Sequence, residues 1–164
     1  MKKSLALLTA LVMAVGFTLA GCGDKKEDTS LADVKAKGEL VMGLDDSFPP
    51  MGFRDEDQNI VGFDVDVAKE VAAKMGVELK LQPIDWNSKE QELSTGNVDC
   101  LWNGFTKTEK REKEMNLSDP YMKNTQVVVV LADSDINNIA DLAGKVVDVQ
   151  SGSSAELAID NMPD

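Results

Sequence analysis

The chain contains no histidine, and its 164 residues include two cysteines and one tyrosine. The absence of histidine excludes catalytic Ser-His and Cys-His pairs and histidine metal sites. The sequence also lacks the GxxxxGK[ST] loop that cradles phosphates and the GxGxxG turn of dinucleotide-binding folds. Acidic pairs such as Asp45 with Asp46 are plentiful in so acidic a chain and carry no specific signal for acid-base catalysis.

The first 21 residues have the pattern of a secretory signal peptide. Two lysines are followed by an almost entirely apolar run over residues 5–19, and small residues then precede Cys22. Small residues directly before a cysteine fit the bacterial lipobox, in which the thiol is acylated and the chain is cut just before it. An uncleaved membrane helix is the alternative, because the uncharged residues 4–23 approach the ~20 needed to span a bilayer. We expect cleavage and a lipid anchor on Cys22.

The charge of the chain is strongly negative, with 17 basic and 29 acidic residues and a net charge of −12. Removal of residues 1–21 would take away two lysines and leave −14. Such a surface repels phosphate backbones, so nucleic acid is not an expected partner. With Cys22 used for lipid, only Cys100 remains, and no internal disulfide is expected. Cys100 lies in an apolar segment and is predicted to be a buried strand residue.

Strand and helix patterns alternate through the chain from about residue 31. The patterns predict, in order, a strand at 39–44, a helix at 64–75, a strand at 77–81, a helix at 87–94 and a strand at 98–102. Gly76 stands where a helix C-terminal cap belongs. This alternation predicts an α/β fold with a mostly parallel sheet and helices on both faces.

A second unit is predicted after Tyr121. Its patterns indicate a strand at 126–131, a short helix at 136–142, a strand at 145–149 and the start of a helix at 153–159. About 40 residues are too few to close a hydrophobic core of their own. The polar residues 22–30 suit a flexible tether between the lipid and the folded part.

Three segments carry a family resemblance. The first comprises residues 43–53 (GLDDSFPPMGF) and 61–68 (VGFDVDVA), the second residues 102–111 (WNGFTKTEKR) and 117–121 (LSDPY), and the third residues 144–154 (GKVVDVQSGSS). In this order and spacing they resemble the polar-amino-acid branch of the bacterial extracellular solute-binding proteins, the receptors of ABC importers. The resemblance runs from about residue 31 to the end of the chain.

The resemblance implies the type II periplasmic-binding fold, with two α/β lobes and a ligand cleft between them. It divides the chain into a signal peptide at 1–21, a lipid-anchored tether at 22–30, lobe one at 31–120, a hinge at 121–125 and the start of lobe two at 126–164. The ligand would close the lobes about the hinge, and the closed form would dock onto a membrane permease. We expect a monomer, lipid-anchored outside the cell membrane in the periplasm or at the cell surface, with no cofactor.

The resemblance also assigns ligand contacts. Arg111 corresponds to the family arginine that binds the ligand carboxylate, for which a planar guanidinium is suited. Without the resemblance, Arg111 would be read as an exposed helix residue, and Ser153 as a helix cap. The full predicted set is Asp45, Phe48, Asn103, Gly104, Thr106, Arg111, Gln150, Ser153 and Ser154.

Asp45 and Gln150 together favour a ligand side chain with hydrogen-bond donors, such as that of glutamine, arginine, lysine or histidine. Phe48 is expected to form an aromatic wall, and Trp86 is a weaker candidate because large aromatic residues more often pack in a core. Met51 departs from the family pattern, in which many relatives have an aromatic residue at this position.

Two other function classes stay open. A cyclohexadienyl dehydratase is one, because some such enzymes share this receptor fold, and an extracellular sensor domain is another. Relatives continue beyond the point that corresponds to Asp164, where they complete lobe two and supply an acidic residue for the ligand ammonium. The sequence therefore predicts a truncated receptor that binds its amino acid weakly or not at all.

Overall fold

A computed structural model describes residues 28–162 of the chain. The predicted signal peptide and Cys22 lie outside these residues. Residues Val34–Asp164 form one compact unit. Helix α2 comprises Ser30–Lys37. The predicted boundaries at residues 120 and 125 stay predictions.

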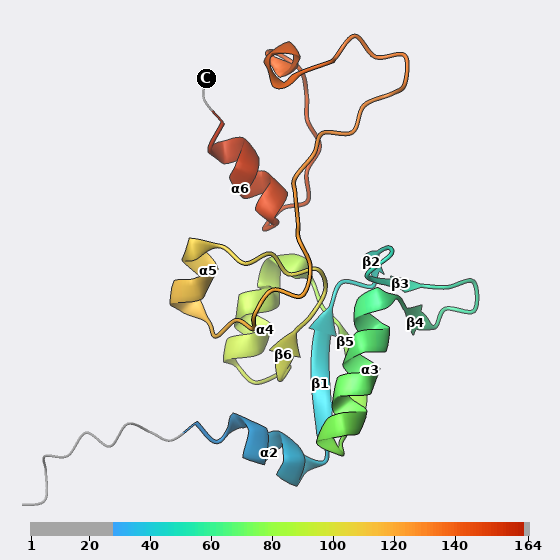
Figure 1. Cartoon of the computed structure of the whole chain (residues 1–164), viewed down its shortest axis with the longest axis vertical. Helices are drawn as coiled ribbons and strands as arrows, with labels where there is room; N and C mark the ends of the chain where they lie inside the picture. The colour runs from blue at the N-terminus through green and yellow to red at the C-terminus, as the bar shows by residue number, and fades with distance from the viewer. Residues whose placement is uncertain (1–27, 163–164) are drawn as a thin grey trace, which may run out of the picture. The chain divides into compact units, whose positions relative to one another are not determined.

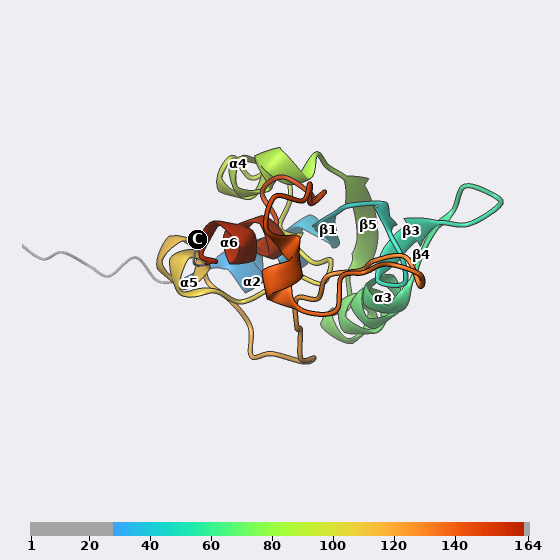
Figure 2. The ribbon, with the colours of Figure 1, turned by 90° about the horizontal axis from the view of Figure 1, so that it is seen from above.

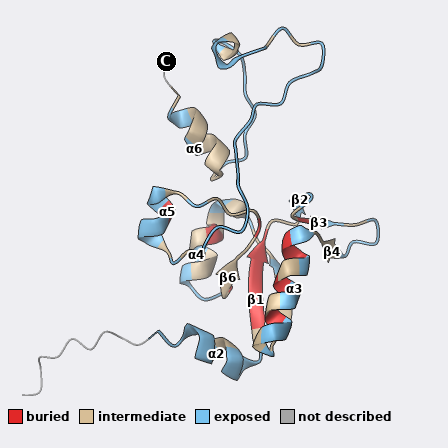
Figure 3. Cartoon of the chain, viewed as in Figure 1, coloured by how far each residue is buried: buried red, intermediate tan, exposed pale blue. Residues whose placement is uncertain are grey.

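A parallel three-stranded sheet forms the centre of this unit (Figure 1). Strand β1 (Glu39–Leu44) lies between β5 (Glu78–Pro83) and β6 (Cys100–Leu101). Residues 40–44 of β1 are all buried, as befits a central strand that is covered on both faces (Figure 3). The predicted strands are thus confirmed, although β6 is shorter than the sequence pattern indicated.

Helix α3 (Phe63–Met75) packs against the sheet through an apolar stripe. Val65 and Ala68 of α3 form one buried cluster with Met42 and Leu44 of β1. The helix ends at Gly76, whose φ of 76° is the left-handed cap conformation predicted for it. A short helical segment, η1 (Trp86–Ser88) followed by α4 (Lys89–Ser94), lies on the other side of β1 from α3 (Figures 1 and 2).

A second small sheet was not foreseen from the sequence. Its antiparallel strands are β2 (Ser47–Phe48), β3 (Gly52–Arg54) and β4 (Ile60–Val61). The turn between β3 and β4 is closed by Asp55, whose carboxylate accepts hydrogen bonds from the amides of Asp57 and Asn59. Strands of two or three residues are too short for alternation to be recognised.

The two strands predicted at residues 126–131 and 145–149 are wrong. Neither segment pairs with a strand, and both are exposed, with Val129 at 86% and Val146 at 94% of full exposure (Figure 3). The regular elements here are η2 (Ile139–Leu142) and α6 (Ser154–Asp160). An apolar run specifies a strand only where neighbouring strands and a covering layer are present, and the described residues supply neither to these two segments.

Candidate functional site

A cavity of about 320 Å³ brings together most of the predicted ligand contacts. Eight of the nine predicted residues line it: Phe48, Asn103, Gly104, Thr106, Arg111, Gln150, Ser153 and Ser154. The ninth, Asp45, is joined to the set because its Oδ2 accepts a hydrogen bond of 2.8 Å from Nε2 of Gln150. Residues far apart in sequence thus converge on one small space.

Arg111 enters this cavity from α5 (Glu109–Glu114), where only 8% of it is exposed. Its Nη1 donates to the carbonyl of Thr106 at 2.8 Å and its Nη2 to the carbonyl of Gly152 at 3.3 Å. The guanidinium carbon lies 4.1 Å from the centre of the Phe105 ring. The exposed helix position that composition alone favours is therefore wrong for Arg111.

The pKa of Arg111 reflects its burial. Desolvation lowers the pKa of the guanidinium, while the negative charges of Glu90 and Glu114 act in the opposite direction. An arginine stays cationic at physiological pH even when its pKa falls. The cavity therefore has one fixed positive charge in its wall.

Gly104 occupies a position that excludes a side chain. Its φ of 57° lies in the left-handed region, and a Cβ there would stand 3.2 Å from Cε1 of Phe48. Its amide donates a hydrogen bond of 2.6 Å to Oδ2 of Asp64. Glycine is thus needed both for the turn and for the close approach of the Phe48 ring.

A hydrogen-bonded network crosses one side of the cavity. The hydroxyls of Thr106 and Ser154 share a hydrogen bond of 3.0 Å. Nδ2 of Asn124 donates to Oγ1 of Thr106 at 2.6 Å, and Nε2 of Gln126 donates to Oγ of Ser154 at 3.0 Å. Asn124 and Gln126 also line the cavity. Neither residue was predicted, since nothing in the sequence separates them from other polar loop residues.

Ser153 is the N-terminal cap of α6. Its Oγ accepts hydrogen bonds of 3.2 Å from the amides of Ala155 and Glu156. Glu156 in turn accepts from the amide of Gly152 at 2.7 Å. The capping role expected for Ser153 is confirmed, and the residue lines the cavity at the same time.

Asp45 is an anionic group at the far end of the predicted set. Its Oδ1 accepts hydrogen bonds from the amide and the hydroxyl of Ser47, at 2.9 and 2.6 Å. Burial acts to raise the pKa of Asp45, but the hydrogen bonds from Ser47 and Gln150 outweigh it and hold the pKa below its ordinary value. Asp45 is therefore a carboxylate at neutral pH.

Among the described residues that line the cavity, Asp148 carries the sole carboxylate. It follows the apolar Val146 and Val147 and was read from the sequence only as part of a strand. Trp86 also lines the cavity, with its ring edge-on to that of Phe105 at 5.9 Å. The cavity thus has carboxylate, guanidinium and aromatic groups in its wall.

Asn103 is buried to 3% exposure, and its Nδ2 has no hydrogen-bond partner among the described residues. A buried amide nitrogen without a partner is destabilising by about 1–3 kcal/mol. The same residue lines the cavity. This nitrogen lies beside Gly52, where a Cβ would stand 2.6 Å from it.

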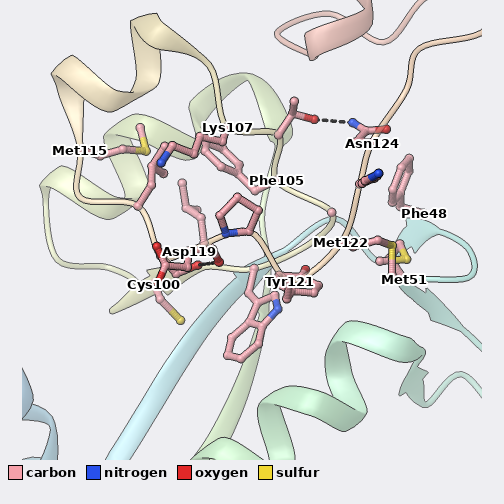
Figure 4. A pocket seen from close by; sticks show the side chains of 18 of the residues that line it. Phe48, Met51, Cys100, Phe105, Lys107, Met115, Asp119, Tyr121, Met122 and Asn124 are labelled. Carbon is pink, nitrogen blue, oxygen red and sulfur yellow. Dashed lines mark hydrogen bonds between the residues drawn. The ribbon is translucent and has the colours of Figure 1, made fainter.

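A larger cavity of about 630 Å³ adjoins this one (Figure 4). Its wall includes the side chains of Phe105, Met115, Tyr121 and Met122, together with Cys100. Arg111 and Gln150 do not line it. Burial, with the charge of Asp99, raises the pKa of the Cys100 thiol to about 11, so this cysteine is protonated at neutral pH. The larger cavity has charged residues too, among them Lys107 and Asp119, but of the nine predicted ligand contacts only Phe48, Gly104 and Thr106 line it.

Among residues 28–162, no helix is long and apolar enough to cross a membrane. No cluster of three or more metal-ligating side chains lies among these residues either.

The chain is similar in sequence and in structure to proteins that are named as binding proteins. It is 38% identical over 156 residues to the arginine-binding extracellular protein ArtP of Bacillus subtilis, an alignment covering 95% of this chain and 58% of ArtP. It resembles the structure of an ABC uptake transporter substrate-binding protein from Streptococcus pneumoniae with bound histidine, with a TM-score of 0.78 and 37% identity. That match covers 81% of this chain and 54% of the Streptococcus protein.

One structural neighbour is an enzyme, an ancestral cyclohexadienyl dehydratase, with a TM-score of 0.54 and 35% identity. The match covers 56% of this chain and 34% of the dehydratase. The chain spans a little over half the length of the curated relative ArtP. The profile of the bacterial extracellular solute-binding proteins, family 3, matches residues 40–161, and the chain belongs to this family.

Proposed function

We propose that this chain belongs to a lipid-anchored receptor outside the cell membrane that binds a polar amino acid and delivers it to an ABC-type importer. The observation that carries the proposal is the convergence of Arg111, Thr106, Gln150 and Ser154 on one cavity. Its volume of about 320 Å³ is at the lower end of the range of about 300–1,000 Å³ found for small-molecule sites.

The proposed ligand position follows from charge. Arg111 has guanidinium donors left beyond its two backbone bonds, and these would receive the ligand carboxylate. Asp148 would face the ligand ammonium, since a zwitterion taken out of water needs a partner for each charge. The Asp45 carboxylate, linked to Gln150, would receive the donors of the side chain.

We infer that arginine is the first ligand to test. An anionic Asp45 favours a cationic side chain, and a guanidinium can donate two parallel bonds to a carboxylate. The relative ArtP is an arginine-binding protein. Glutamine, lysine and histidine are tested as well, because Gln150 can form a hydrogen bond with the side chain of each.

We expect residues 1–164 by themselves to bind weakly. The side of the cavity formed by Asp148, Val149 and Gln150 belongs to an exposed segment without strand partners. Binding would have to order this segment, which lowers the affinity. A ¹⁵N NMR titration with millimolar arginine should move the resonances of Arg111 and Thr106, whereas calorimetry at micromolar protein should give no clear heat.

Two outcomes would contradict this proposal. If leucine moved the cavity resonances and arginine did not, the roles of Asp45 and Gln150 would be wrong. If prephenate or arogenate were converted to an aromatic product, the protein would be a dehydratase. A sharp calorimetric signal with any common amino acid would contradict weak binding but not the receptor function.

The anchor is tested separately from the ligand. Cells that express the chain and receive an alkyne-labelled fatty acid should label it through Cys22. The Cys22→Ser variant should lose the label and leave the membrane fraction. Label retained by the variant would rule out Cys22 as the acylated residue.

A further inference from the structure

The segment that contains Asp64 holds a buried carboxylate that the proposed ligand contacts do not use. Asp64 lies at the start of α3 and is fully buried. Its Oδ2 accepts a hydrogen bond of 2.6 Å from the amide of Gly104, and its Oδ1 accepts one of 2.6 Å from the hydroxyl of Tyr121. Each oxygen therefore has a donor, as a buried charge requires.

The two donors come from separate parts of the chain. Gly104 belongs to the loop that also contributes Asn103 and Thr106 to the smaller cavity. Tyr121 opens the segment that was predicted as a hinge. Three residues later, Asn124 donates its 2.6 Å hydrogen bond to the Thr106 hydroxyl. The Asp64 carboxylate therefore binds both the Gly104 loop and the segment that begins at Tyr121. That segment in turn bonds to the loop through Asn124 and Thr106.

The position of Asp64 is itself fixed by its backbone. The amide of Asp64 donates to the carbonyl of Met51 at 3.0 Å, and that of Phe63 donates to the carbonyl of Pro50 at 2.9 Å. The ring of Phe63 stacks on the ring of Tyr121, with centres 6.4 Å apart. The carboxylate thus points at its two partners from a rigid helix start.

We propose that Asp64 is a positioning residue of the amino-acid site, which ties the Gly104 loop to the segment that begins at Tyr121. Asp64 lines neither cavity, so it acts through Gly104 and Thr106 and not by touching the ligand. The inference rests on the proposed function, because it assigns a role in that same site. The tie consists of the hydrogen bonds from Gly104 and Tyr121 to Asp64. These bonds are present without any ligand and can be measured without one.

The first experiment measures the tie in the full chain. Tyr121 is the sole tyrosine of the sequence, so ultraviolet titration of tyrosine reports on it alone. In Asp64→Asn the phenol loses its anionic partner and should ionise at a lower pH than in the wild type. The amide proton of Gly104 should move upfield in the NMR spectrum, because its acceptor is no longer charged.

Two further variants separate the tie from general damage. Tyr121→Phe removes one hydroxyl, and should move the NMR signals of Asn124 and Thr106 while leaving that of the Gly104 amide nearly in place. Asp66→Asn is the matched control, since Asp66 lies in the same helix but is exposed and pairs with Lys69 at 3.2 Å. It should change none of these readouts. An unchanged tyrosine titration and Gly104 signal in Asp64→Asn would overturn the inference.

The second experiment links the tie to the ligand. In the arginine titration, Asp64→Asn should weaken binding about tenfold, Tyr121→Phe should weaken it less, and Asp66→Asn should leave it unchanged. Wild-type affinity in Asp64→Asn would overturn the positioning role. If the wild type bound no amino acid while the Tyr121 and Gly104 readouts responded as expected, the proposed function would fail and the tie would stand.

Discussion

The guanidinium carbon of Arg111 lies 4.1 Å from the centre of the Phe105 ring, and two backbone carbonyls accept hydrogen bonds from its Nη1 and Nη2. These contacts with the ring and the carbonyls orient the remaining donors of Arg111. A residue read from its neighbours as a surface cation is therefore a preoriented part of the cavity wall.

We predict that Arg111→Lys lowers the affinity for arginine at least about tenfold. A lysine keeps the charge but can neither stack on Phe105 in the same way nor make two parallel bonds to a carboxylate. The affinity is measured by NMR titration of the cavity signals. Lys110→Ala, on the exposed side of the same helix, is the control and should bind as the wild type does. Equal affinities in the two variants would mean that Arg111 does not contact the ligand.

Asp45→Asn should change the preference among ligands more than the overall affinity. The substitution keeps an acceptor but removes the negative charge, so arginine should lose about tenfold relative to glutamine. Competition between the two ligands, followed by NMR, gives the ratio directly. Asp46→Asn is the matched control, because Asp46 pairs with Arg54 at 2.6 Å instead of bonding to Gln150. A ratio that stayed the same in Asp45→Asn would remove Asp45 from the specificity site.

Gly62→Ala should destabilise the fold by about 3 kcal/mol. Gly62 has a φ of 135°, and a Cβ there would lie 2.4 Å from the carbonyl oxygen of Met51, which is backbone and cannot move aside. Gly96→Ala is the comparison, since Gly96 has a φ of 76° but open space around it. It should lose only about 1 kcal/mol. Urea unfolding measures both, and similar losses would contradict the steric argument.

The fold should lose stability in alkali through Tyr121. Burial, followed by the hydrogen bond and charge of Asp64, raises the pKa of this phenol above its ordinary value of 10.0. The folded state then keeps the proton at a pH where the unfolded chain releases it. The contribution is fully present below about pH 10 and is lost as the pH rises beyond it. Urea unfolding between pH 8 and 11 should show a steeper decline in the wild type than in Tyr121→Phe.

The parallel sheet of β1, β5 and β6 could be predicted because each of its strands pairs with a neighbouring strand. Residues 39–44 read as a buried strand and have β5 and β6 on either side. Residues 126–131 read as an even stronger strand, yet Val129 is 86% exposed. The apolar residues of a segment show that it could be buried as a strand. Whether it pairs as a strand depends on which other segments lie beside it.

The lining of the smaller cavity could be predicted from the family pattern in part, while the role of these residues as ligand contacts stays a prediction. The resemblance named eight residues that line the smaller cavity. It gave no role to Asp64, whose two hydrogen bonds span 40 and 57 residues of sequence. It also missed Asp148, which reads as one more acidic residue in an acidic chain. Hydrogen bonds between residues so far apart in the sequence leave no local pattern from which they could be predicted.

At the proposed site, the hydrogen bond between Gln150 and Asp45 would make ligand binding an exchange of hydrogen-bond partners. Gln150 donates one hydrogen bond to the Asp45 carboxylate. A ligand that also donates one hydrogen bond would replace that of Gln150 with little gain in binding free energy. A guanidinium brings two or more and leaves a surplus. At the proposed site a neutral ligand would therefore have to displace a donor that the protein itself supplies, and this competition would favour a cationic ligand.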